Sequence, residues 1–427
     1  MATSEPVEIN WPEGMDEEER ENLRGALIAY DEALKDFEAD HRIVFPSDAE
    51  RNRQFYGFLK KSAKAWAKPG PCMYDGCTKT SIPRSHTISL SSSIRLIAEN
   101  NHVVTPQFRE GVVELVSVGV REASTFPGFC DEHEALFSDF ETKKQMTTAE
   151  HFGLQAFRTV CREIYTKRHH RKRTEELRAD YRKLREEYVV GRLKKAHTGT
   201  QPFNVSGLRF ENDPIETKFV EALNDIQTDL PQLENLYRAI LNDLQNGTDG
   251  VAMFVQSLDV QLPVCLSGLG VLNYMDKDVR KRALCFLAII PEAGDTKIML
   301  GATSEHEGIV RLHFHDKSSP AFLERLESWM IYGSDHWFMT PSAWAAIPEG
   351  RQRAIREELL ETLSLADPVP FSLLDGLRKQ IVSLIEQQLA SGAIPSQDIV
   401  RVKELLDREE AKLAYVAPPR ETTENTT

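Results

Sequence analysis

The fold of this chain depends on two short segments, CMYDGC at residues 72–77 and CDEH at residues 130–133. The first carries two cysteines with four residues between them, of which Asp75-Gly76 predict a tight turn that points both thiols inward. The second follows Pro127-Gly128 and precedes an apolar pattern, which places it at the first turn of a helix, where backbone amides favour a thiolate. Two close pairs of Cys or His ligands from separate parts of a chain are typical of a structural metal site.

We therefore predict that four side chains bind one structural Zn²⁺ ion, namely Cys72, Cys77, Cys130 and His133. A knuckle followed by a ligand pair at a helix start is the treble-clef arrangement. The alternative is that Cys72 and Cys77 are ordinary buried thiols. Cys161, Cys265 and Cys285 stand alone and are expected in the core. Disulfides are not expected, because the acidic segment 1–20 does not have the pattern of a secretory signal.

The bulk composition predicts a globular protein of more than one domain. A chain of 427 residues exceeds the usual size of one core. Its 41% hydrophobic and 28% charged residues are ordinary for globular proteins. No apolar run approaches the roughly eighteen residues of a spanning helix, so we expect a cytoplasmic protein that does not contact membranes. The net charge of -14 is uneven, because residues 1–50 hold 15 acids and 4 bases, whereas residues 51–71 hold six bases and no acid.

The expected fold class is α+β, with a mainly helical N-terminal half that contains the treble-clef zinc module, then an α+β domain with a largely antiparallel sheet flanked by C-terminal helices. The expected segments are an acidic then basic helical arm (1–71), the zinc-binding module (72–140), a long basic helical hairpin (141–195), a linker (196–214), the α+β domain (215–415) and a disordered tail (416–427). Branched and aromatic residues predict strands at 112–120, 251–258, 262–266, 282–290, 296–302 and 309–315. Apolar spacing predicts helices at 219–244, 320–331, 350–363, 370–390 and 397–413.

The segment IPRSHTIS, residues 82–89, lies between the two ligand pairs. A small residue, a histidine and a branched residue after a zinc knuckle, followed by a ligand pair on a helix, resemble the HNH or His-Me finger endonucleases over about residues 72–140. The resemblance implies that His86 is the general base for attack of water on a phosphodiester, helped by a nearby Mg²⁺ or Mn²⁺ ion. It further implies a nuclease of a bacterial restriction or phage-defence system.

The chain departs from the family pattern at Ser85, where the family often has Asp or His. Asn100, Asn101 and His102 cannot be matched by spacing to the family's later residues. Two other interpretations of His86 remain open, an alternative zinc ligand and a structural histidine bonded to the backbone.

Positive charge is dense from Lys167 to Lys195, with twelve bases against five acids. The run begins with Lys167, Arg168, Arg171, Lys172 and Arg173, and it predicts contact with DNA or RNA phosphates. A solvated helix face or a protein interface explains the same charge.

Two further functional classes stay open. One is a non-catalytic assembly or binding subunit with a purely structural zinc finger, which meets a protein partner or a second copy through the helical hairpin and C-terminal domain. The other is a small-molecule enzyme within 215–415, although no GxxxxGK[ST] or GxGxxG motif supports nucleotide binding. His313 and His315 alternate along an expected strand and are interpreted as a surface or core pair.

Overall fold

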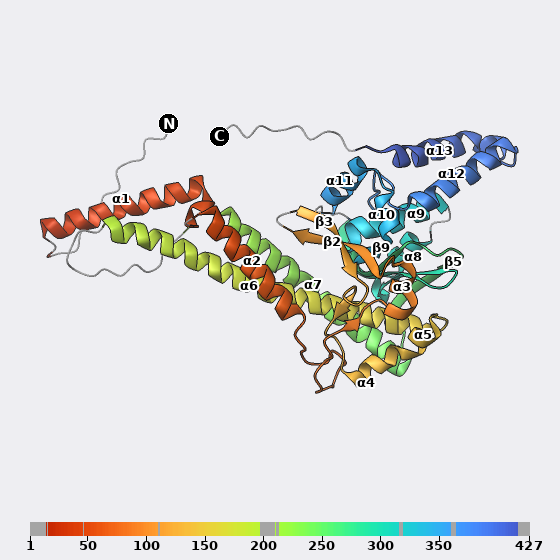
Figure 1. Cartoon of the computed structure of the whole chain (residues 1–427), viewed down its shortest axis with the longest axis horizontal. Helices are drawn as coiled ribbons and strands as arrows, with labels where there is room; N and C mark the ends of the chain where they lie inside the picture. Colours follow the sequence, from red (N-terminus) through yellow and green to blue (C-terminus); the bar gives the residue numbers. More distant parts are fainter. Residues whose placement is uncertain are drawn as a thin grey trace. The chain divides into compact units, whose positions relative to one another are not determined.

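The computed structural model describes residues 14, 16–45, 47–109, 112–196, 210, 213–315, 319–359 and 364–416 (Figure 1). The expected linker and tail lie almost wholly outside these residues. Contacts divide the chain into two compact units, each assembled from two stretches of sequence. Unit 1 comprises 1–65 and 168–228, and unit 2 comprises 66–167 and 229–427. Among the described helices, none is long and apolar enough to cross a membrane.

Unit 1 is helical in its described part. It contains α1 (Glu17–Ala39), η1 (His41–Val44) and most of α2 (Asp48–Trp66), together with parts of α6 (Ala149–Ala196) and α7 (Pro214–Asn246). A capping box between Asp16 and Glu19 begins α1. Its buried stripe is Ala26, Ala29, Ala33 and Phe37, whereas Leu23 and Leu27 of the same helix are exposed. The small alanines pack against Val189 and Leu193 of α6, since short side chains let two helices approach closely.

The segment predicted to form a helical hairpin is one continuous helix, α6, of 48 residues. No proline interrupts it, and its many Glu, Lys and Arg residues have high helix propensity. Its buried seam changes along its length because residues 149–167 belong to unit 2 and residues 168–196 to unit 1. Helix α7 likewise continues through Pro231, where the sequence predicts that the helix is interrupted or redirected.

The centre of unit 2 is a seven-stranded antiparallel sheet in the order β3-β2-β9-β6-β7-β8-β5. The strands are β2 (His102–Arg109), β3 (Val112–Gly119), β5 (Val251–Leu258), β6 (Val264–Asp276), β7 (Val279–Pro291), β8 (Thr296–Thr303) and β9 (Trp337–Met339). The short strand β9 joins the pair β3-β2 to the group β6-β7-β8-β5, because Met339 pairs with Val104 on one side and with Val264 on the other. Strands from the predicted zinc module therefore belong to the same sheet as the strands beyond residue 250.

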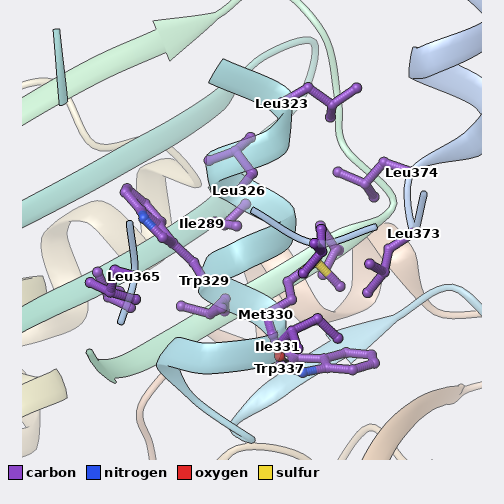
Figure 2. Packing of buried hydrophobic residues seen from close by; sticks show 14 of the residues in the cluster. Ile289, Leu323, Leu326, Trp329, Met330, Ile331, Trp337, Leu365, Leu373 and Leu374 are labelled. Atoms are coloured by element: carbon purple, nitrogen blue, oxygen red, sulfur yellow. Dashed lines mark hydrogen bonds between the residues drawn. The ribbon is translucent and has the colours of Figure 1, made fainter. Parts of the chain in front are cut away.

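Both faces of the sheet are covered, which explains why β6 and β7 read as nearly continuous apolar runs. One face packs on α8 (Glu307–Phe314), α9 (Ser319–Ser328) and η5 (Trp329–Gly333). Figure 2 shows Trp329 and Trp337 in this layer, with Leu373 and Leu374 near α9. The opposite face packs on α6, α7 and the segment that carries the metal-ligand residues. That segment therefore shares its core with the sheet.

The C-terminal helices follow the sheet as predicted, and one predicted strand is wrong. They are α10 (Pro341–Ala345), α11 (Glu349–Glu358), α12 (Asp375–Ala390), η6 (Ser396–Asp398) and α13 (Ile399–Ala414). Residues 309–315 are not a strand, because α8 covers 307–314. Val310, His313 and Phe314 are buried with helical spacing, while His315 is exposed, so the two histidines do not share a strand face.

Candidate metal centre

The four predicted zinc ligands come together. Their ligand atoms, three Sγ atoms and one imidazole nitrogen, all lie within 4.8 Å of one another. Sγ of Cys77 is 3.9 Å from Sγ of Cys130, and Nδ1 of His133 is 3.2 Å from Sγ of Cys130 and 3.5 Å from Sγ of Cys72. In a tetrahedron with Zn–S bonds of about 2.3 Å the sulfurs are about 3.8 Å apart. The donor set and its spacing therefore fit one Zn²⁺ ion.

Local backbone geometry explains how the ligands converge. Gly76 has φ of 73°, which closes the turn after Tyr74, and the N–H of Cys77 donates to the carbonyl of Tyr74 at 3.1 Å. Cys130 is the N-cap residue of α4 (Asp131–Glu134), as predicted. Gly128 precedes it, where a Cβ atom would lie 2.4 Å from the Phe126 ring. A side chain at residue 128 would therefore displace the second ligand pair.

Neighbouring groups hold the ligands in place. The ring of Tyr74 stacks on His133 at 4.0 Å between centroids, with an interplanar angle of 10°. The hydroxyl of Tyr237, on α7, donates to the carbonyl of Met73 at 2.7 Å.

The thiols of the candidate ligands differ in their pKa values. Burial raises the pKa of the Cys72 thiol to about 11. Burial acts in the same direction on Cys130, but hydrogen bonds from the backbone of His133 and Glu132 bring the pKa of that thiol below its usual value.

His86 lies on β1 (Ser85–His86), which pairs with β4 (Thr125–Phe126), the strand that precedes the second ligand pair. It is half-buried, and its Nε2 atom is buried without a hydrogen-bond partner. Burial, and then the Arg158 guanidinium, lower the pKa of His86 to about 4. The imidazole is therefore neutral at neutral pH.

Three charged side chains surround His86, and sequence reasoning did not identify their arrangement. Glu134 follows the ligand His133, and it accepts hydrogen bonds from the Ser85 side chain and the His86 backbone. Arg158, on α6, is fully buried. Its Nη2 atom lies 2.8 Å from Glu141 and 3.8 Å from Glu134, and its guanidinium stacks on the Phe137 ring at 3.8 Å. The available signal was an arginine inside the apolar seam of α6, next to Phe157.

Asn100, Asn101 and His102 form the turn into β2. Both asparagines have positive φ, and the N–H of Val120 donates to the carbonyl of Asn101 at 3.0 Å. His102 is exposed, and its Nδ1 lies 2.8 Å from the carbonyl of Asn100. These contacts give the three residues a structural role in a turn.

The basic run lies on α6, and most of it has acidic partners. Nζ of Lys167 is 2.7 Å from Asp229. Two more pairs lie within α6, Arg171 with Glu175 at 3.1 Å and Arg173 with Glu176 at 2.6 Å. Arg168 also has a partner, and Lys172 is exposed. Much of the local positive charge is therefore compensated within the protein.

No protein-family model, no curated protein and no solved structure matches this chain.

Proposed function

We propose that this protein acts on nucleic acid through an HNH-like, treble-clef module in residues 72–140, as a phosphodiesterase of the kind found in bacterial phage defence. The observation that supports this proposal is the contact between the strand that carries His86 and the helix that carries the second ligand pair. Strand β1 carries His86, strand β4 pairs with it, and helix α4 begins at the ligand Cys130 and carries Glu134 toward His86. Although η2 (Leu90–Ile94), α3 (Arg95–Ile97), β2 and β3 lie between β1 and β4 in the chain, β1, β4 and α4 bring His86 and Glu134 close to the start of the helix that carries the second ligand pair.

In this proposal, Zn²⁺ would be held by Cys72, Cys77, Cys130 and His133 and would fix the module without taking part in hydrolysis. His86 would accept a proton from water as the water oxygen bonds to phosphorus and the P–O bond to the leaving group breaks. The lowered pKa of His86 keeps it in the unprotonated form that a base requires.

The residues around His86 fit a Mg²⁺ or Mn²⁺ ion poorly. Glu134 and Glu141 are the nearby carboxylates, and both face the buried guanidinium of Arg158. Among the described residues, the group of Cys72, Cys77, Cys130 and His133 is the one in which three or more metal-ligating side chains converge. We therefore derive no step through a second metal ion.

A nuclease assay tests the proposal. Full-length, zinc-loaded protein is incubated with plasmid DNA or single-stranded RNA in Mg²⁺ or Mn²⁺, and His86→Ala is compared with the wild type. Loss of a general base is expected to slow cleavage by about 10²-fold or more. His102→Ala is the matched control, because His102 is an exposed histidine in a turn. Equal cleavage by His86→Ala and wild type would remove His86 from catalysis.

The second candidate is a non-catalytic binding or assembly subunit with a structural zinc site. The pairing of Arg158 with Glu134 and Glu141 favours it, because these carboxylates are already neutralised by a protein cation. This candidate predicts no cleavage by the wild type under any metal condition. Such a subunit binds either nucleic acid or protein, and filter binding at several salt concentrations distinguishes the two. A nucleic-acid-binding subunit loses affinity for nucleic acid steeply as the salt concentration rises. A protein-binding subunit retains no nucleic acid even at low salt.

A further inference from the structure

A pocket of about 240 Å³ opens in unit 2 between α7 and the sheet, and none of the four metal-ligand residues lines it. Its walls come from α7, from β7 and from the junction of β8 with η4 (Ser304–His306). Helix α7 supplies Gln232, Asn235 and Leu236, which lie on one helix face because they are three or four residues apart. The volume equals that of roughly eight water molecules in the liquid, which suits a small organic molecule rather than a single ion.

One wall of the pocket carries Arg282, which belongs to a group of three charged side chains with an excess of positive charge. Nη1 of Arg282, on β7, is 2.6 Å from Oδ1 of Asp229, and the other oxygen of Asp229 is 2.7 Å from Nζ of Lys167. Two cations therefore share one carboxylate, and the three side chains carry a net charge of about +1. The acid in the pocket lining is Glu305, whose carboxylate accepts a hydrogen bond from Thr303 at 3.1 Å and lies 3.6 Å from His306. Its side chain is 70% exposed, so solvent screens its charge. Arg282 is held with its guanidinium at the pocket, where it attracts an anion.

The remaining walls offer neutral hydrogen-bonding groups. Nδ1 of His306 is 3.0 Å from the hydroxyl of Tyr274, which fixes the ring. Burial lowers the pKa of His306, so the ring is neutral and can accept or donate a hydrogen bond. Thr303 and the amides of Gln232 and Asn235 add further polar groups, and Leu236 is fully buried beneath them. This combination of an apolar floor, a few polar groups and one cation is typical of a site for a small polar ligand.

We propose that this pocket binds a small organic anion, a phosphomonoester or a carboxylate with a hydrogen-bonding body, whose charged group meets Arg282. This ligand site is independent of the proposed nucleic-acid activity. It gives the α+β part of the chain a ligand-binding role that neither the metal centre nor His86 supplies.

Calorimetric titration of the full-length, zinc-loaded protein tests the site. The probes are ribose 5-phosphate and adenosine 5′-monophosphate for the phosphomonoester class and glutamate for the carboxylate class. Inorganic phosphate serves as an anion without an organic group. We expect saturable binding of one class at one site per chain, with inorganic phosphate weaker. Arg282→Gln should weaken that binding at least tenfold, and Arg401→Gln should not, since Arg401 is exposed on α13 and does not line the pocket.

Asn235→Ala provides a second variant, because Asn235 is exposed on α7 and its loss does not affect the Asp229 contacts. It should weaken binding several-fold while the protein unfolds as the wild type does. The proposal is overturned if the wild type binds none of the four probes. It is equally overturned if folded Arg282→Gln and Asn235→Ala bind the preferred probe as tightly as the wild type.

Discussion

At the scale of single residues, unit 2 buries a carboxyl group whose ionised form lowers the stability of the folded state. Glu292, at the end of the β7 region, is 2% exposed, and its Oε1 accepts the N–H of Met146 at 2.6 Å. Burial raises the pKa of Glu292 to about 7, although Lys297 lies 3.7 Å from its other oxygen. Lys297 is closer to Asp295, at 2.5 Å, so it compensates Glu292 only in part.

Replacing Glu292 by an uncharged residue measures how much its buried charge destabilises the folded state. Because the pKa of Glu292 is higher in the folded than in the unfolded state, the folded state binds more protons between about pH 4.5 and 7, and the contribution of Glu292 to stability is lost as the pH rises through that window. Glu292→Gln keeps the acceptor for Met146 and removes the charge. At pH 8.5 the variant should be more stable than the wild type by on the order of 2 kcal/mol, and at pH 4.5 the two should be equal.

Urea unfolding followed by tryptophan fluorescence measures this difference, because Trp66, Trp329, Trp337 and Trp344 all belong to unit 2. Glu150→Gln, at an exposed position on α6, is the control and should change nothing. A pH-independent difference between Glu292→Gln and wild type would contradict the assignment of the charge.

At the scale of elements, one carboxylate joins α7 to α6 within unit 1. Oδ1 of Asp213 accepts the N–H groups of Ile215 and Glu216, each at 3.0 Å, and so caps the start of α7. The same side chain accepts the hydroxyl of Tyr181 at 3.0 Å and pairs with Arg185, which is 8% exposed.

Asp213→Ala should therefore destabilise unit 1 by about 3 kcal/mol. Loss of a helix cap alone costs about 1 kcal/mol, and the buried Arg185 guanidinium is left without its partner. The measurement is amide hydrogen exchange over residues 168–196 and 214–228, which should become faster in the variant. Asp225→Ala, at an exposed position of α7, is the control. Unchanged protection in Asp213→Ala would show that the cap and ion pair add little.

Elements differ in how far the sequence specified them. Helices α1 and α7 and strands β5 and β8 follow from local apolar patterns, because each pattern spans several turns or a full strand. The segment 309–315 was predicted as a strand because its branched and aromatic residues suit one. A run of seven residues is too short to distinguish the apolar period of a helix from that of a strand. The single helix α6 was taken for two because its buried seam shifts where it passes from unit 2 to unit 1.

The same contrast holds in the candidate site. The candidate zinc ligands were predictable because a tetrahedral ion needs closely spaced donors, and that requirement is visible in CMYDGC and CDEH. Arg158 was not, since its role depends on non-local contacts with Glu134 and Glu141 across the fold. Strand β9 was also not predicted, because three residues are too few to show an alternating apolar pattern or to indicate that they join two parts of a sheet.

At the scale of the whole molecule, the candidate zinc ligands belong to a core larger than their own segment. Cys72 and Cys130 share a cluster with Phe157 of α6, Leu236 of α7 and Phe286 of β7. All four ligands lie in unit 2, and the described part of unit 1 contributes none. Metal binding can supply on the order of 10 kcal/mol of folding free energy, which is comparable to the whole stability of a typical domain.

Zinc removal should therefore weaken unit 2 selectively. We expect one zinc per chain by elemental analysis of the wild type, a large loss of zinc in Cys77→Ala, and full zinc content in Cys161→Ala, whose thiol is buried away from the ligand group. In scanning calorimetry a chelator should lower the melting temperature of the unit 2 transition by more than about 10 °C and leave the unit 1 transition in place, because only unit 2 loses a ligand-bound core. If the metal content is far below one zinc per chain, or if the chelator moves neither transition, the four side chains do not form the centre around which unit 2 folds.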